Sequence, residues 1–256
     1  MNLLPLQKGI LYGPINSRRL GRSLGINLMP QKYKLCSFNC VYCHYGWTNE
    51  HTTDLKPFAA DLPEFDEVMH AIQNMLVSKQ QFDYITFSGN GEPTLHPQFA
   101  ALAAEIARLR DKLRPDVKIA LLSNSSGLNA AVKESIMHID LPVFKLDAGT
   151  QKTFSAINRP AQGLDLERIT EYLQSLNGIY IQTVLVNGSP CNTKSGELQA
   201  YCDRLKIIRP RKAHIYSIDR PVPNANIERV VPDDLEKIAV SCTEETGVEV
   251  QAFYLR

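Results

Sequence analysis

The sequence predicts an α/β fold of parallel strands covered by helices, and its first indication is a regular alternation of strand-like and helix-like segments. A further observation concerns the polar residues of one predicted strand. Lys145 and Asp147 share one face of the segment 143–148, while Phe144 and Leu146 share the other. Helices outside a closed barrel require an apolar strand face, so the polar face is predicted to look into a partly hydrated lumen. A doubly wound open sheet and a barrel both fit the alternation, and the strand charges favour the barrel.

The chain begins with an irregular stretch, 1–22, punctuated by Gly9, Gly13, Pro14 and Gly21. This stretch carries a local basic cluster of Arg18, Arg19 and Arg22. The cluster has two interpretations, solvated surface or contact with an anionic substrate.

The strands and helices then follow in order. Apolar residues recur at helical spacing from 65 to 76, which predicts an amphipathic helix: Phe65, Val68, Met69, Ile72, Met75 and Leu76. Strands are predicted at 23–29, 82–88, 117–123, 143–148, 179–186 and 213–218, and the further helices at 99–113, 128–138, 164–176 and 195–208. A final helix, 233–246, leads to a short strand, 249–254. With no repeat or linker, residues 1–256 are interpreted as one domain with a barrel over 23–220 and an extension over 221–256.

Composition narrows the class of protein. Hydrophobic residues make up 44% of the 256 residues, charged residues 21%, and the net charge is +1, as in soluble globular proteins. Near neutrality gives no global electrostatic case for nucleic acid or membrane partners. No apolar run approaches the length of a membrane span, and the first residues lack the pattern of a signal peptide. We therefore expect a cytoplasmic protein with no membrane partner.

Three cysteines, Cys36, Cys40 and Cys43, stand at C-x₃-C-x₂-C spacing directly after the first predicted strand. Three thiolates on one loop can converge on a soft metal centre, and the missing fourth thiolate would leave one metal position open. A zinc site completed by His44 is an alternative, although structural zinc usually takes two separated ligand pairs. A disulfide would leave one cysteine unpaired.

Polar residues follow several other predicted strands, at the edge where parallel α/β barrels carry their active sites. Gly89 and Gly91 in the turn Ser88-Gly-Asn-Gly-Glu92 let the backbone approach a ligand and offer carbonyl oxygens to an ammonium group. The remaining candidates at strand ends are Asn124, Cys191, Asp219 and Arg220. Cys191 is a weak candidate for a functional thiol, and Asp219 and Arg220 are candidates for substrate contact or for a loop salt bridge. Cys202 and Cys242 belong to apolar helix faces and are interpreted as core.

The cysteine spacing, Tyr42 before the last cysteine and the glycine-rich strand end resemble the radical S-adenosylmethionine (radical SAM) superfamily. The runs 13–27, 88–97 and 218–221 look more closely like iron–sulfur oxidoreductases related to the wyosine-forming tRNA enzymes. Those tRNA enzymes place additional cysteines before the main motif, whereas the first 35 residues here contain none. Their substrate is therefore not transferred to this chain.

The resemblance implies a six-stranded partial (βα)₆ radical SAM barrel with a short C-terminal helix and strand. It implies that the three loop cysteines hold a [4Fe–4S] cluster whose open iron binds the amine and carboxylate of S-adenosylmethionine. The turn 88–92 matches the family's "GGE" element, with Asn90 at its second position, and is expected to bind the cofactor's amino group. By the same resemblance Asn124, Lys145 and Asp147 are expected to reach the ribose and carboxylate, and Tyr42 to pack near the adenine.

The reaction implied is reductive cleavage of S-adenosylmethionine to methionine and a 5′-deoxyadenosyl radical, which abstracts hydrogen from a substrate. A flavodoxin or ferredoxin is the expected electron donor, and the substrate class is open among small molecules, peptides and RNA. Two alternatives remain at this point: a non-catalytic binding module stabilised by zinc, and an activase that places a glycyl radical on a partner protein.

Overall fold

The computed structural model describes residues 3–127 and 129–255 and packs them as two compact units. The N-terminal unit comprises residues 6–37 and 49–142, and the C-terminal unit comprises residues 3–5, 38–48 and 143–255. The chain therefore crosses from one unit to the other within the cysteine loop, between Ser37 and Phe38. The division into barrel and extension within a single domain stays a prediction.

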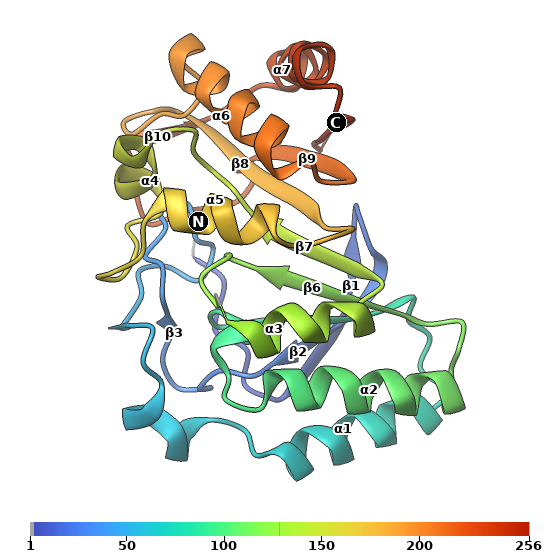
Figure 1. Cartoon of the computed structure of the whole chain (residues 1–256). Helices are drawn as coiled ribbons and strands as arrows, with labels where there is room; N and C mark the ends of the chain where they lie inside the picture. The colour runs from blue at the N-terminus through green and yellow to red at the C-terminus, as the bar shows by residue number, and fades with distance from the viewer. Residues whose placement is uncertain (1–2, 128, 256) are drawn as a thin grey trace. The chain divides into compact units, whose positions relative to one another are not determined.

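The N-terminal unit is built on the strands β1 (Leu11–Ser17), β2 (Gly21–Asn27), β5 (Tyr84–Ser88) and β6 (Lys118–Ser123), in that order. β2, β5 and β6 run parallel, while β1 is antiparallel to β2. Two helices, α1 (Phe65–Val77) and α2 (Phe99–Leu113), pack side by side in this unit (Figure 1). A short parallel pair, β3 (Leu35–Cys36) and β4 (Glu50–His51), carries the first loop cysteine.

The start of α1 follows from its sequence. Glu64 and Glu67 form a reciprocal capping box that satisfies backbone donors in the first turn. The predicted apolar stripe then buries Val68, Ile72 and Leu76. Each of these residues is 0–2% exposed, so the stripe faces the core of the unit.

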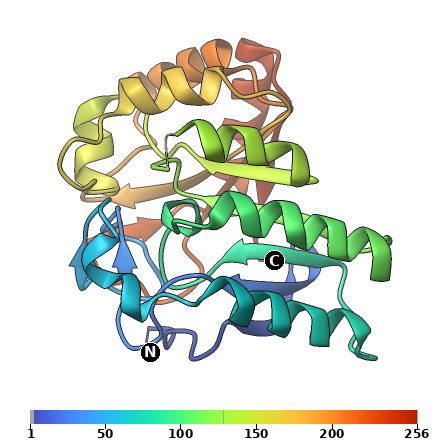
Figure 2. The same ribbon diagram turned by 60° about the horizontal axis from the view of Figure 1, so that its bottom comes forward.

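The C-terminal unit contains, in this order, the parallel strands β7 (Leu141–Lys145, of which residues 143–145 belong to this unit), β8 (Tyr180–Gly188), β9 (Lys212–Ser217) and β11 (Val250–Phe253). The short strand β10 (Ile227–Arg229) is antiparallel to β8. The helices of this unit, visible in Figures 1 and 2, are α4 (Gln151–Ile157), α5 (Leu166–Gln174), α6 (Ser195–Ile208) and α7 (Pro232–Thr246). Proline opens α7, and Gly247 closes it in the left-handed conformation, as both residue types favour.

The six strands predicted for the barrel are confirmed as β2, β5, β6, β7, β8 and β9. The expectation that 1–22 is irregular was wrong, because residues 11–17 form β1. Its pairing with β2 shifts register between Tyr12 and Ile15, around Gly13 and Pro14, and this interruption hides the strand pattern. The helix expected over 128–138 is α3 (Ala130–Ser135) followed by a 3₁₀ turn, Ile136–His138, and residue 128 lies outside the described residues. Within the described part of the chain, none of the helices is both long and apolar enough to cross a membrane.

Candidate active site

The three loop cysteines are all free thiols in the described structure. Cys36 ends β3 in the N-terminal unit, whereas Cys40 and Cys43 lie in the segment of the C-terminal unit that follows four and seven residues later. Cys36 and Cys40 are buried and Cys43 is half-buried. Within neither unit do the described residues gather three or more His, Cys, Asp or Glu side chains into a metal site. The zinc site of Cys36, Cys40, Cys43 and His44 stays an alternative prediction.

Two of the buried sulfurs each receive an amide hydrogen bond. The Nδ2 of Asn124 lies 3.5 Å from the Sγ of Cys36, and the Nδ2 of Asn158 lies 3.5 Å from the Sγ of Cys40. Burial raises the pKa of the Cys40 thiol to about 11, against a smaller lowering by the charge of Lys145. A thiolate here requires donors or a metal to offset its charge, and amide donors to sulfur are typical of iron–sulfur centres. The donor set therefore fits a soft-metal cluster.

Asp147 is the centre of a buried network in the C-terminal unit. Its side chain is fully buried and accepts hydrogen bonds from the hydroxyl of Tyr42, from the Nδ2 of Asn158 at 2.6 Å and from the backbone N–H of Val184 at 2.8 Å. Lys145 places its Nζ 3.6 Å from the same carboxylate and 5.2 Å from the centre of the Tyr42 ring. Burial, reinforced by Asp147, raises the pKa of Tyr42 well above its usual range, so the phenol stays neutral and donates. The internal ion pair considered for Lys145 and Asp147 is thus present.

Asn158 is a site residue that the sequence analysis missed. It follows α4 directly and is 1% exposed, and the same amide nitrogen that reaches Asp147 also lies 3.2 Å from the Tyr42 hydroxyl. Its Oδ1 has no hydrogen-bond partner among the described residues. Because 118 positions separate Asn158 from Cys40 along the chain, no local spacing could have found it.

The glycines of the turn after β5 are required by close packing inside the N-terminal unit. A Cβ on Gly89 would lie 2.6 Å from the Oδ1 of Asn27, and Gly89 has a φ of +116°. A Cβ on Gly91 would lie 1.8 Å from the carbonyl oxygen of Leu35. Asn90, between them, is buried and donates to two backbone carbonyls at 2.9 Å each. The turn is therefore a rigid, fully packed element, and the Asn90 side chain holds it in place.

Glu92, which ends the turn, is 1% exposed and is occupied by donors of its own unit. Its carboxylate accepts from the N–H and hydroxyl of Thr94, from the Ser123 hydroxyl at 2.8 Å and from the Asn124 N–H at 2.5 Å. Burial raises the pKa of Glu92, while these hydrogen bonds act in the opposite direction. The carboxylate thus joins the glycine-rich turn to the end of β6 and positions Asn124, whose amide reaches Cys36. Ser88, at the start of the turn, pairs its hydroxyl with that of Tyr12 at 2.5 Å.

Asp219 and Arg220 follow β9 in the C-terminal unit and act electrostatically on His44. Burial lowers the pKa of His44, and Arg220 lowers it further, whereas Asp219 raises it. His44 also makes a hydrogen bond with the backbone of Pro221, which raises its pKa and places the loop after β9 beside the segment that carries Cys43. Cys191, also in this unit, is half-buried with its Sγ 3.2 Å from the hydroxyl of Thr193.

The three arginines of the basic cluster near the N-terminus have different surroundings. Arg22 forms an ion pair with Asp83 at 2.7 Å on the surface of the N-terminal unit. Arg18 is exposed and Arg19 half-buried in the turn between β1 and β2. The substrate role considered for Arg18 and Arg19 stays a prediction.

Comparison with known proteins decides the family. Residues 31–190 match the family model of the radical SAM superfamily. The chain belongs to the radical SAM superfamily. It is 33% identical over 243 residues to the UPF0026 protein of Methanocaldococcus jannaschii, covering 93% of this chain and 72% of that protein. It is therefore an enzyme of the superfamily that the cysteine loop resembles.

Solved radical SAM structures share the fold. One, a structure of TYW1 with a lysine-pyruvate adduct bound, has a TM-score of 0.58 at 14% identity and covers 88% of this chain and 75% of that chain. Another, Streptococcus suis SuiB bound to S-adenosylmethionine, has a TM-score of 0.60 at 14% identity and covers 88% of this chain. This chain spans only 49% of SuiB. These matches confirm the predicted α/β radical SAM fold.

Proposed function

We propose that this radical SAM enzyme binds a [4Fe–4S] cluster through Cys36, Cys40 and Cys43 and cleaves S-adenosylmethionine reductively. When bound, the cluster supplies the electron that yields methionine and a 5′-deoxyadenosyl radical for hydrogen abstraction. The observation that carries the proposal is the state of the thiols. Three free cysteines stand at the family's spacing, and two of them are buried with an amide donor on the sulfur.

The chain's own residues have distinct roles in this proposal. Asn124 and Asn158 donate to the sulfurs of Cys36 and Cys40 and so offset the charge of a buried thiolate. Asp147 fixes the orientation of Asn158, because its carboxylate accepts from the same amide. Tyr42, held neutral by burial, donates its hydroxyl hydrogen to Asp147 in this network.

S-adenosylmethionine is the proposed second cofactor, supported by family membership and by the SuiB structure that holds it in the same fold. We assign its amino group to the backbone of the turn Ser88, Gly89, Asn90, Gly91 and Glu92. Packing fixes that turn, and the side chains of Asn90 and Glu92 are occupied within the unit. Asn124, Lys145 and Asp147 are the proposed contacts to the ribose and carboxylate, and Tyr42 is the proposed neighbour of the adenine.

A one-electron donor such as a flavodoxin or ferredoxin is the proposed partner, in the cytoplasm. The substrate class stays open among small molecules, peptides and RNA. Arg18, Arg19, Asp219 and Arg220 are the proposed substrate contacts, with Cys191 the weaker candidate for a functional thiol.

The test is anaerobic. The purified protein is reconstituted with iron and sulfide, reduced with dithionite and assayed for conversion of S-adenosylmethionine to 5′-deoxyadenosine. We expect conversion by the wild-type protein and by Cys242→Ala, whose cysteine lies outside the loop, and its loss in Cys40→Ala. Zinc in place of iron, with neither iron–sulfur absorbance nor cleavage, would support the zinc-stabilised binding module instead. Iron-dependent cleavage with a co-purifying partner that acquires a glycyl radical would identify an activase.

A further inference from the structure

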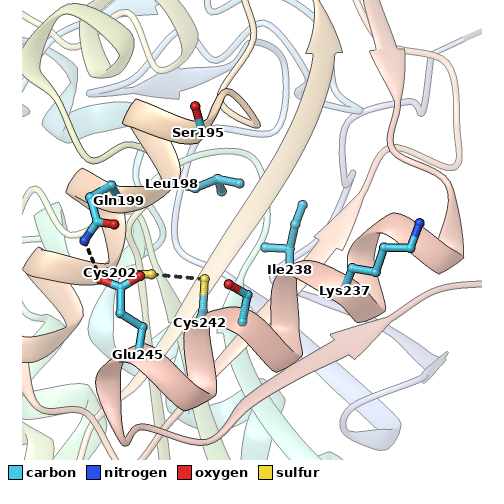
Figure 3. Close-up of a pocket in the computed structure, with 9 residues that line it drawn as sticks. Ser195, Leu198, Gln199, Cys202, Lys237, Ile238, Cys242 and Glu245 are labelled. Atoms are coloured by element: carbon cyan, nitrogen blue, oxygen red, sulfur yellow. Dashed lines mark hydrogen bonds between the residues drawn. The ribbon is translucent and has the colours of Figure 1, made fainter.

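Two cysteines outside the loop face each other across two helices of the C-terminal unit. Cys202 lies on α6 and Cys242 on α7, and their Sγ atoms are 3.1 Å apart (Figure 3). Both are free thiols and each is 2% exposed. A disulfide joins sulfurs at about 2.05 Å, so closing this bond requires an approach of only about 1 Å.

A cavity of about 370 Å³ gives access to the pair. Both cysteines line it, and Figure 3 shows Gln199 and Glu245 beside the sulfurs and Lys237 farther along α7. Glu245 is anchored by Lys206, whose Nζ lies 2.8 Å from its carboxylate. The cavity has ample volume for a molecule as small as a peroxide.

We propose that Cys202 and Cys242 are a reversible dithiol–disulfide site that reacts with a small peroxide. One thiol, as its thiolate, attacks a peroxide oxygen and becomes a sulfenic acid, releasing one molecule of water once a proton is taken up. The second thiol then attacks that sulfur, and the second water leaves. In total two thiols and one hydrogen peroxide give one disulfide and two molecules of water, and a dithiol reductant reverses the change by exchange.

The cysteine pair is connected to the candidate active site through α6, because α6 holds the loop that follows Asp147. The carboxylate of Glu197, in the first turn of α6, accepts from the N–H of Gly149 at 2.5 Å and from the hydroxyl of Thr150 at 2.8 Å. Arg204, two residues after Cys202, donates to the carbonyl of Gly149 at 2.6 Å. A covalent bond from α6 to α7 therefore anchors the helix that positions this loop.

Burial raises the pKa of both thiols, so thiolate is scarce at neutral pH and the pair reacts more slowly than an exposed cysteine. The pair is therefore expected to stay reduced in the presence of weak oxidants. Its advantage over other cysteines is proximity, since the second sulfur lies within reach when the first is oxidised.

The test treats the full-length, iron-loaded protein with hydrogen peroxide, blocks remaining thiols under denaturing conditions and maps the tryptic peptides by mass spectrometry. Cys202 lies in the peptide 195–204 and Cys242 in 238–256, so a bond between them joins two peptides with the loss of two hydrogens. We expect this linked product to predominate over every other linkage of either cysteine and to disappear on reduction with dithiothreitol. We also expect the oxidised protein to unfold at a temperature several degrees higher, because the bond closes a long loop.

Matched variants keep the test decisive. Cys202→Ala and Cys242→Ala should each abolish both the linked peptide and the rise in unfolding temperature, whereas Cys191→Ala should preserve both. Separate sulfinic acids on the two cysteines, or two blocked thiols after peroxide treatment of the wild-type protein, would overturn the proposal. These outcomes are independent of whether S-adenosylmethionine is cleaved.

Discussion

Replacing Asp147 by asparagine tests the buried network at the centre of the C-terminal unit. The carboxylate accepts three hydrogen bonds, from the Tyr42 hydroxyl, the Asn158 amide and the Val184 N–H. Asparagine has one acceptor oxygen, and its amide group only donates. If the oxygen stays on Val184, two buried donors lose their acceptor, and Lys145 loses its counter-charge. Each buried unsatisfied donor costs about 1–3 kcal/mol, so the loss of acceptor for two donors should lower the free energy of unfolding of Asp147→Asn by about 2–6 kcal/mol.

The assay is urea-induced unfolding of the wild-type and variant proteins. Their free energies of unfolding are compared with the same dependence on urea concentration (m-value) used for both proteins. Asp116→Asn is the matched control, because the side chain of Asp116 is 71% exposed and lies 3.6 Å from that of Arg114, its partner in a surface ion pair. A surface pair of this kind contributes at most about 1 kcal/mol. Indistinguishable effects of the two substitutions would refute the account of the network.

Three further predictions concern single side chains. Asn158→Leu removes the amide that donates to the sulfur of Cys40. Because amide donors to sulfur raise the reduction potential of iron–sulfur centres, the midpoint potential of the reconstituted protein, measured by electron paramagnetic resonance (EPR) titration, should fall. An unchanged potential would contradict this role. Glu92→Gln replaces the carboxylate that accepts from several buried donors, so the free energy of unfolding should fall by about 1–3 kcal/mol and thermal unfolding should occur at a lower temperature. An unchanged unfolding temperature would argue against the internal role of Glu92. Hydrogen bonds from Arg22 hold the pKa of Asp83 at about 2 instead of 3.8. The ion pair therefore stabilises the folded state fully when the pH is above the pKa of Asp83 in the unfolded chain, and this stabilisation is lost as the pH falls toward 2. The difference in unfolding temperature between wild type and Asp83→Asn should therefore shrink on acidification, and a constant difference would contradict it.

The parallel strands could be predicted because each is a short segment with several buried apolar residues between segments of helical period. Strand β1 could not, because the register shift at Gly13 and Pro14 removes the alternation on which strand prediction depends. The helix α4 was also missed, because its seven residues are too few for a periodic signal. Helices and strands could thus be predicted where the hydrophobic pattern was long, and were missed where it was short or interrupted.

The candidate site was readable to the extent that its residues lie in short motifs. The loop cysteines and the turn 88–92 carry their own spacing. Asn158 belongs to no motif and enters the site only through packing against Asp147 and Cys40. Glu92 was correctly placed in the turn, but only the structure shows that its carboxylate is directed at donors of its own unit. Motif spacing identifies candidate residues, while the direction of each side chain depends on contacts distant in sequence.

The most direct test of the central claim is the EPR spectrum of the reduced, reconstituted protein with and without S-adenosylmethionine, together with its iron and sulfide content. The account predicts about four iron and four sulfide per chain and a spectrum that changes when S-adenosylmethionine is added, because one iron lacks a protein ligand. In Cys40→Ala both the cluster and the change should be lost. A wild-type cluster whose EPR spectrum does not change when S-adenosylmethionine is added would contradict the claim that this protein binds the cofactor at an open iron.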